Sequence, residues 1–111
     1  MDTDKAVLGA YMTVPDEETG RAIAHELVGR RLAACANIFP GVSSIYAWNG
    51  TIASETEVVV WFKTTEARRE ELIAAVRELH PYDVPCLVAY PAAGGLPEYL
   101  DWVRTESAKP G

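Results

Sequence analysis

An Asn-Gly pair at positions 49 and 50 separates two long runs of β-forming residues, 34–48 and 51–64. Asn-Gly between two such runs is the strongest local signal for a tight β-hairpin, because both residues tolerate a positive φ. Each arm has about 14 residues, which at ~3.3 Å per residue would extend about 46 Å if straight. A globule with a radius of gyration of ~13 Å is only about 34 Å across. The hairpin is therefore expected to bend or to project from the body of the molecule.

The first arm of this hairpin contains Pro40-Gly41, a pair that predicts a bulge or bend in an edge strand. The arms also carry large apolar and aromatic side chains: Ile45, Tyr46, Trp48 and Trp61. A projecting arm of this kind exposes strand edges and apolar surface, which proteins usually cover with another subunit. The sequence therefore predicts a homo-oligomer closed through sheet edges.

The rest of the chain alternates between strand and helix patterns. The expected elements are a buried strand at 6–14, a helix capped by Asp16 and ending near Arg30 and Arg31, a helix at 66–79 capped by Thr64 or Thr65, a strand at 84–90, and a short helix from Pro97 to about Thr105. The order β-α-β-β-α-β with an added C-terminal helix predicts an α+β fold, the ferredoxin-like antiparallel sheet with helices on one face. We expect one domain over residues 1–111, with its core at about 7–106.

Charge and hydropathy limit the classes of partner. The net charge is −6, from 16 acidic against 10 basic residues, and this balance disfavours nucleic acid and anionic lipid surfaces as partners. The apolar run that begins at Ala6 is too short for a membrane span or a signal peptide. The expectation is a cytoplasmic protein that binds neither nucleic acid nor membrane.

Few residues offer enzymatic chemistry. The only cysteines, Cys35 and Cys86, are far apart and form no CxxC motif, so they are expected to be reduced and largely buried. Neither has the sequence context of a catalytic nucleophile, and the only histidines are His25 and His80. The glycine motifs that cradle phosphates are also absent from the sequence. We therefore expect no enzyme activity.

The segment HPYDVPC, residues 80–86, holds the best candidate ligands. His80 and Cys86 are soft or borderline donors that favour copper or zinc, and Met12 of the first predicted strand could add a thioether suited to Cu(I). The alternative is a stiff turn in which two prolines fix the backbone, Tyr82 packs and Cys86 belongs to the core. Spacing alone leaves both interpretations open.

Several longer segments resemble the CutA family of divalent-cation tolerance proteins. They are TVPDE (13–17), LAACANIFPGVSSIYAWNGTI (32–52), ETEVVVWFKT (55–64), HPYDVP (80–85) and PEYLDWV (97–103). The resemblance covers about residues 7–106. It implies a ferredoxin-like subunit similar to PII signalling proteins, a compact homotrimer, and a role in tolerance of copper and other divalent metals without an established reaction.

The sequence departs from the family pattern at two of the candidate ligands. The pattern HPYxxPE has a glutamate where this chain has Cys86, and the cysteine often found at the end of the first strand is replaced by Met12. The resemblance therefore implies Met12, His80 and Cys86 as a ligand set whose preference is moved towards Cu(I).

Two further hypotheses about the function remain open at this point. The first is a PII-like module that binds a small metabolite or a partner protein in clefts between subunits, lined by Trp48, Lys63, Tyr82 and Asp83. The second is an acylphosphatase-like enzyme on the same fold. It is disfavoured because the first strand turns at MTVPDE rather than at a glycine-rich phosphate loop.

Overall fold

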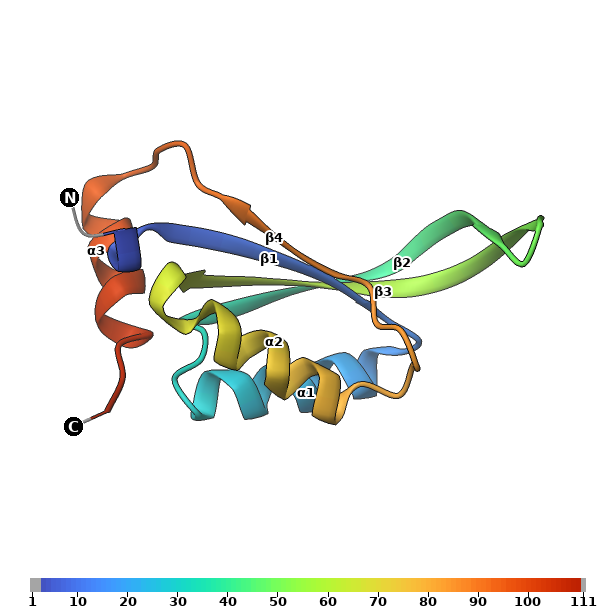
Figure 1. The fold of residues 1–111 in the computed structure, drawn as a ribbon, viewed down its shortest axis with the longest axis horizontal. Helices are drawn as coiled ribbons and strands as arrows, with labels where there is room; N and C mark the ends of the chain where they lie inside the picture. The colour runs from blue at the N-terminus through green and yellow to red at the C-terminus, as the bar shows by residue number, and fades with distance from the viewer. Residues whose placement is uncertain (1–2, 111) are drawn as a thin grey trace.

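The computed structural model describes residues 3–110 as a four-stranded antiparallel sheet with two helices on one face and a third helix at one end (Figure 1). The elements are η1 (Thr3–Lys5), β1 (Val7–Val14), α1 (Glu17–Gly29), β2 (Cys35–Trp48), β3 (Thr51–Thr65), η2 (Glu66–Arg68), α2 (Arg69–Leu79), β4 (Leu87–Pro91) and α3 (Pro97–Glu106). The strand order in the sheet is β2-β3-β1-β4, and every pairing is antiparallel. The predicted α+β fold is confirmed.

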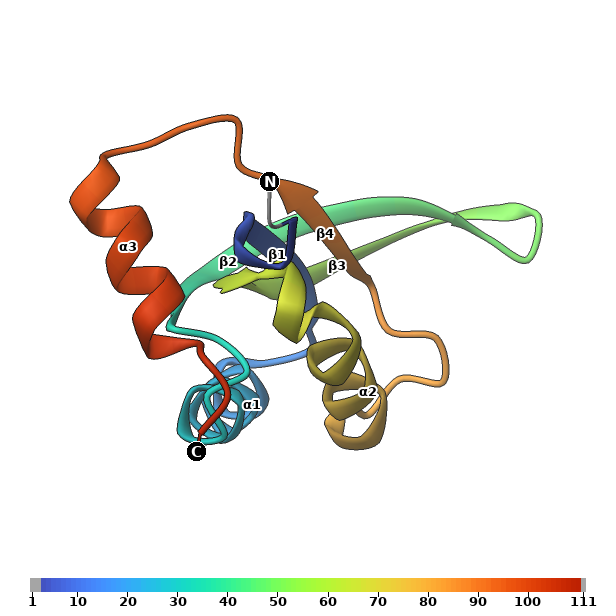
Figure 2. The same cartoon turned by 60° about the vertical axis from the view of Figure 1, so that its left-hand side comes forward.

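The core lies between the sheet and the layer formed by α1 and α2, which run along the same face of the sheet in both views (Figures 1 and 2). Alternate residues of β1 point into this layer, and Met12 and Val14 are fully buried there together with Phe62 of β3. The opposite face carries an aromatic row, in which Trp61 lies 5.7 Å from Tyr11 and 5.9 Å from Tyr90 between ring centroids. We call this second side the open face.

Helix α1 ends in a Schellman motif with an arginine at the position that glycine usually takes. Leu32 donates its backbone N–H to Leu27 O at 2.9 Å, and Arg31 donates its own to Val28 O at 3.0 Å. Arg31 has a φ of 61°, in the left-handed region. Leu27 and Leu32 are both buried in the core, which supplies the hydrophobic contact typical of the motif.

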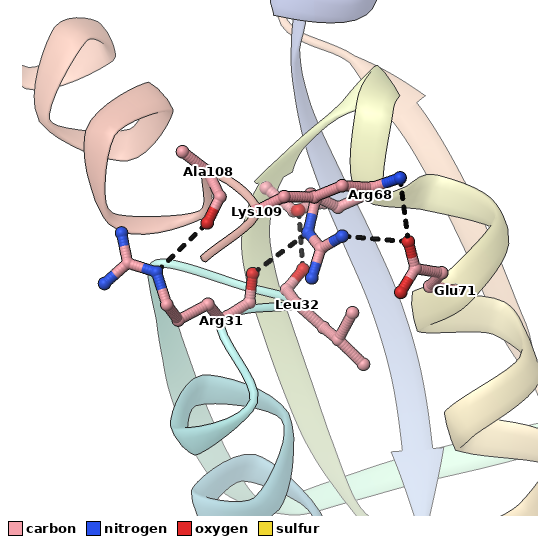
Figure 3. Close-up of polar contacts among 7 residues, drawn as sticks. Arg31, Leu32, Arg68, Glu71, Ala108 and Lys109 are labelled. Atoms are coloured by element: carbon pink, nitrogen blue, oxygen red, sulfur yellow. Dashed lines mark hydrogen bonds and ion pairs between the residues drawn. The ribbon is translucent and has the colours of Figure 1, made fainter. Parts of the chain in front are cut away.

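Arg31 and the buried Arg68 together connect α1, η2 and the C-terminal segment (Figure 3). Arg68 donates from Nε to Arg31 O at 3.2 Å and pairs with Glu71 at 2.9 Å. The Arg31 side chain donates to Thr105 O at 2.7 Å and to Ala108 O at 3.0 Å. Because these carbonyls lie at the end of α3, a cation there also suits the helix dipole.

The long hairpin of β2 and β3 projects as expected. The turn residues Asn49 and Gly50 have φ of 49° and 78°, which fits a type I′ turn. The register of β2 against β3 shifts between Phe39 and Val42, so the bulge predicted at Pro40-Gly41 is confirmed. The described chain measures 45 × 26 × 22 Å, and the hairpin turn forms the far end of its longest axis (Figure 1).

Several local expectations were wrong. Strand β4 begins at Leu87 rather than at residue 84, and residues 66–68 form a separate 3₁₀ turn before α2. Neither expected threonine caps this helix: Thr65 makes no side-chain cap bond, and Thr64 donates its hydroxyl to Leu32 O at 2.6 Å. Asp16 does cap α1, by accepting from Thr19 N at 2.7 Å.

Candidate functional site

A cavity of about 620 Å³ lies on the open face, between the projecting hairpin and the loop that joins α2 to β4. Its residues come from four stretches of chain: Tyr11 and Thr13 of β1, Ser44, Tyr46, Ala47 and Trp48 of β2, Glu55 and Glu57 of β3, and Tyr82, Asp83, Val84 and Cys86 of the loop between α2 and β4. The volume lies in the range of small-molecule sites. The cavity is therefore the candidate functional site of the chain.

Strand register explains why these residues share one side of the sheet. Glu57 pairs with Val42 and Glu55 pairs with Ser44, just beyond the bulge in β2. Alternate residues of β3 from Trp61 to Glu55 belong to the open face, because side chains point to opposite faces in turn. Strand β1 ends opposite Val58, so Glu57 is the first open-face residue of β3 beyond that pairing.

The loop between α2 and β4 forms the other wall, and its shape is set by His80. The ring of His80 is buried, and its Nε2 lies 2.7 Å from the carbonyl oxygen of Thr13. Its Nδ1 accepts a hydrogen bond from Tyr82 N at 3.1 Å. A neutral ring with its proton on Nε2 satisfies both contacts. The His80 and Tyr82 rings then lie 4.7 Å apart between centroids.

Tyr82 crosses from this loop to the sheet and donates its hydroxyl to Glu57 Oε2 at 3.0 Å. Glu57 is only 7% exposed as a whole residue, although it lines the cavity. Burial of the phenol and its hydrogen bond to Glu57 raise the pKa of Tyr82 from 10.0 to about 12. The Tyr82–Glu57 pair thus closes one side of the cavity.

The pKa values of two further tyrosines in the cavity, Tyr46 and Tyr11, are raised as well. The hydrogen bond with Glu55 and partial burial raise the pKa of Tyr46 above its ordinary value. Burial, followed by the charges of Cys86 and Glu57, raises the pKa of Tyr11. Both shifts favour the neutral phenols in a cavity whose ionisable neighbours are acids.

The structure does not bring the three predicted metal donors to one point. Met12 is fully buried in the helix-facing core, whereas Cys86 lies on the open face and lines the cavity. Both ring nitrogens of His80 are engaged in hydrogen bonds. The three residues thus do not fit a ready-made site in this single chain, and metal binding by them stays a prediction. Within residues 3–110, no group of three or more His, Cys, Asp or Glu side chains is arranged to hold a metal ion.

Both cysteines are free, but neither is buried as expected. Cys35 is partly exposed and its Sγ lies 3.3 Å from the hydroxyl of Tyr99, whereas Cys86 is exposed. The expectation failed for Cys86 because it precedes β4 on the open face of the sheet.

Three of the four residues predicted to line a cleft between subunits line this cavity of the single chain, and the cleft between subunits stays a prediction. They are Trp48, Tyr82 and Asp83. Lys63 lies on the open face but further along β3, opposite Gly9, and its Nζ donates to Asn37 Oδ1. The sequence analysis did not identify Glu55 and Glu57, and only the register imposed by the Pro40-Gly41 bulge could have indicated them.

Comparison with known proteins gives a consistent result. Residues 8–106 match the family model described as CutA1 divalent ion tolerance protein. The chain is 50% identical over 93 residues to the divalent-cation tolerance protein CutA of Thermus thermophilus, a match that covers 84% of this chain and 90% of that relative. It is 40% identical over 97 residues to the chloroplastic protein CutA of Arabidopsis thaliana, where the match covers 87% of this chain and 53% of the longer plant protein. The solved structure of the Thermus thermophilus divalent cation tolerance protein superposes with a TM-score of 0.88 at 47% identity, covering 90% of this chain and 97% of that one.

Proposed function

This chain belongs to the CutA1 divalent ion tolerance family, and on that premise we propose that it binds copper or other divalent metal ions and acts in their tolerance. The family is named for tolerance rather than for a reaction, and our proposal includes no catalysed step. The proposed location is the cytoplasm, which cell fractionation followed by immunodetection would test.

The observation that carries the proposal is the charge of the cavity. Its lining contains three carboxylates, Glu55, Glu57 and Asp83, together with the thiol of Cys86. The lining residues include no lysine, arginine or histidine. A concave surface of one sign concentrates the field and draws in ions of the opposite sign. The cavity therefore favours cations over anions.

Cys86 is the member of the predicted ligand set on which metal binding in this cavity depends. Its thiol is exposed and free, and a thiolate prefers soft ions such as Cu(I). Met12 would have to leave the core to reach the same ion, since its side chain is fully buried on the other face of the sheet. His80 would have to give up a hydrogen bond that shapes the loop.

An anaerobic, competitor-based Cu(I) titration of the reduced protein tests this proposal. Cys86→Ser is expected to lose tight binding, whereas Cys35→Ser serves as the matched control because Cys35 lies outside the cavity lining. Met12→Leu keeps the core packed, and its titration tests whether the Met12 thioether contributes to Cu(I) binding. Weak binding that none of these substitutions changes would refute a metal site at Cys86.

We propose that the assembled form is a homotrimer. The single chain exposes large apolar side chains on its projecting arm, with Ile45 73% and Ile52 81% exposed. Strands β2 and β4 are the two edges of the sheet, and unpaired edges invite pairing with another subunit. Light scattering is expected to give about three times the chain mass of 12.1 kDa. A monomer mass at micromolar concentration would contradict the trimer.

A second candidate function is a PII-like module that binds a small molecule, and the size of the cavity favours it. A space of about 620 Å³ is far larger than a metal ion needs, and four aromatic side chains line it. A thermal-shift screen with nucleotides, organic anions and organic cations, run with metal chelated, tests this function. No shift with any compound class would count against it.

A further inference from the structure

The cavity combines aromatic walls with unbalanced negative charge. Its four aromatic side chains are Tyr11, Tyr46, Trp48 and Tyr82, and its carboxylates are Glu55, Glu57 and Asp83. None of these carboxylates forms an ion pair with another described residue of the chain. The face of an aromatic ring attracts cations through its quadrupole, and carboxylates attract them through full charge. Both kinds of group therefore favour a ligand of the same sign.

Glu57 brings a carboxylate to the wall of this cavity. Its side chain is more than nine-tenths buried, yet its only hydrogen-bond partner among the described residues is the neutral hydroxyl of Tyr82. That hydroxyl contacts one carboxylate oxygen, Oε2. No buried side-chain nitrogen or oxygen of the described residues lacks a hydrogen-bond partner, so Oε1 of Glu57 is not a buried atom. Because Glu57 lines the cavity, a cation bound there can approach this carboxylate.

The dimensions and walls of the cavity distinguish between kinds of cation. A bare metal ion contacts only its donor atoms and fills a small part of a space of about 620 Å³. A strongly hydrated ion would also gain little from the aromatic rings. An ammonium group that carries alkyl substituents gains from both, since its alkyl surface packs on the rings and its charge faces the carboxylates.

We propose that this cavity is a binding site for an organic ammonium cation, held between the aromatic walls and the carboxylates of Glu55, Glu57 and Asp83. The inference rests on the second candidate function, binding of a small molecule, and names the chemical class of that molecule. Cys86 lines the same cavity, so the test is made on metal-free protein. Phosphates and carboxylates belong to the opposite class, because the cavity lining offers no cationic side chain to them.

The test uses two probes of similar shape and different charge, tetramethylammonium and tert-butanol, added to the purified, metal-free protein. Binding is followed by NMR, through ligand saturation transfer and the indole N–H signals of the three tryptophans. Only Trp48 among them lines the cavity, so its signal, assigned with Trp48→Leu, is expected to move while those of Trp61 and Trp102 move less. Tetramethylammonium is expected to bind about tenfold more tightly than tert-butanol.

Matched variants separate charge from shape. Glu57→Gln keeps an acceptor for Tyr82 but removes the charge, and it is expected to weaken tetramethylammonium binding about tenfold while leaving tert-butanol unchanged. Glu18→Gln removes a charge from α1, outside the cavity, and is the control. Trp48→Leu, at a position 58% exposed, reports on the aromatic wall if Glu57→Gln fails to fold. Trp102→Leu is the control for that substitution, because Trp102 is 44% exposed on α3.

The outcomes distinguish failure of the ammonium site from failure of the small-molecule function on which it rests. Equal affinity for the two probes, or wild-type affinity in folded Glu57→Gln, would overturn the ammonium site. If anions bind instead in the thermal-shift screen, the small-molecule function stands and the inference fails. If no class of compound binds, both fail. The copper titration of Cys86→Ser is a separate measurement that decides only the metal proposal.

Discussion

At the scale of single residues, the hydrogen bond from Tyr82 to Glu57 has a testable energetic role. Tyr82→Phe leaves the buried Glu57 carboxylate without its donor, and the expected loss is about 1.5 kcal/mol in the free energy of unfolding at pH 8. Urea unfolding monitored by circular dichroism measures it. Tyr46→Phe is the comparison, since Tyr46 is more exposed and a smaller loss is expected.

The same pair predicts how stability depends on alkaline pH. The pKa of Tyr82 is raised from 10.0 to about 12 in the folded chain, so the folded state holds the phenol proton more tightly than the unfolded state. This contribution is fully present below pH 10 and is lost as the pH rises through 12. The stability difference between wild type and Tyr82→Phe should therefore shrink between pH 10 and pH 12. A constant difference over that window would show that the pair does not titrate in this way.

At the scale of elements, the close packing of α1 on the sheet depends on Gly20. A Cβ at this position would lie 3.1 Å from the Cγ2 atoms of Val14 and Val60, both of which are fully buried. Gly20→Ala gains helix propensity of up to about 1 kcal/mol but overpacks the core by about 1–3 kcal/mol. We expect a net loss of about 1 kcal/mol in thermal or urea unfolding.

Gly29→Ala is the matched control in the same helix. A Cβ there meets no atom within 4 Å, and the φ of Gly29 is not positive. We expect this substitution to stabilise the protein by about 0.5 kcal/mol. If the two variants had equal stability, packing at Gly20 would not be what limits the residue at that position.

The arginine at the end of α1 makes a second prediction at this scale. Arg31→Ala and Arg31→Gly both remove the hydrogen bonds to Thr105 and Ala108, but only glycine relieves the left-handed backbone. Arg31→Gly should therefore be about 1 kcal/mol more stable than Arg31→Ala. In both variants, hydrogen exchange at the end of α3 should be faster than in wild type. Unchanged exchange there would mean that the arginine does not hold α3.

At the scale of the whole molecule, the projecting arm is expected to act through assembly rather than through folding of the single chain. Ile45→Lys with Ile52→Lys replaces two highly exposed side chains. Such surface changes alter the stability of a single chain by only about 0.5 kcal/mol. We expect the trimer mass to fall towards that of the monomer in light scattering, with the circular dichroism spectrum retained. A trimer that persists would place the subunit contacts elsewhere.

How much the sequence could predict varied with the range of the interactions involved. The hairpin turn at Asn49-Gly50 and the bulge at Pro40-Gly41 depend on local backbone preferences, and both were predicted correctly. Thr64 does not cap the helix because its hydroxyl donates to Leu32 O, which is distant in sequence, and Thr65 makes no side-chain cap bond either. The left-handed conformation of Arg31 was equally unexpected, since that position normally holds glycine.

The candidate site shows the same limit at longer range. Trp48, Tyr82 and Asp83 were predicted as cleft residues, and all three line the cavity. Glu57 was missed because its role depends on burial and on the contact with Tyr82, 25 positions away. Periodicity gives the face of a strand but not which loop covers it.

The shape of the molecule also bears on how it could be attached to a surface or a reporter. The 3₁₀ turn η1 and helix α3 lie together at one end of the 45 Å axis, where Arg104 donates to Lys5 O at 2.8 Å, and the hairpin turn lies at the other end (Figure 1). A tether or a fluorescent label coupled near Thr3–Lys5 or beyond α3 would leave the cavity and the arm facing away from the support. A sensor chip made in this way would hold each chain by the end opposite its arm.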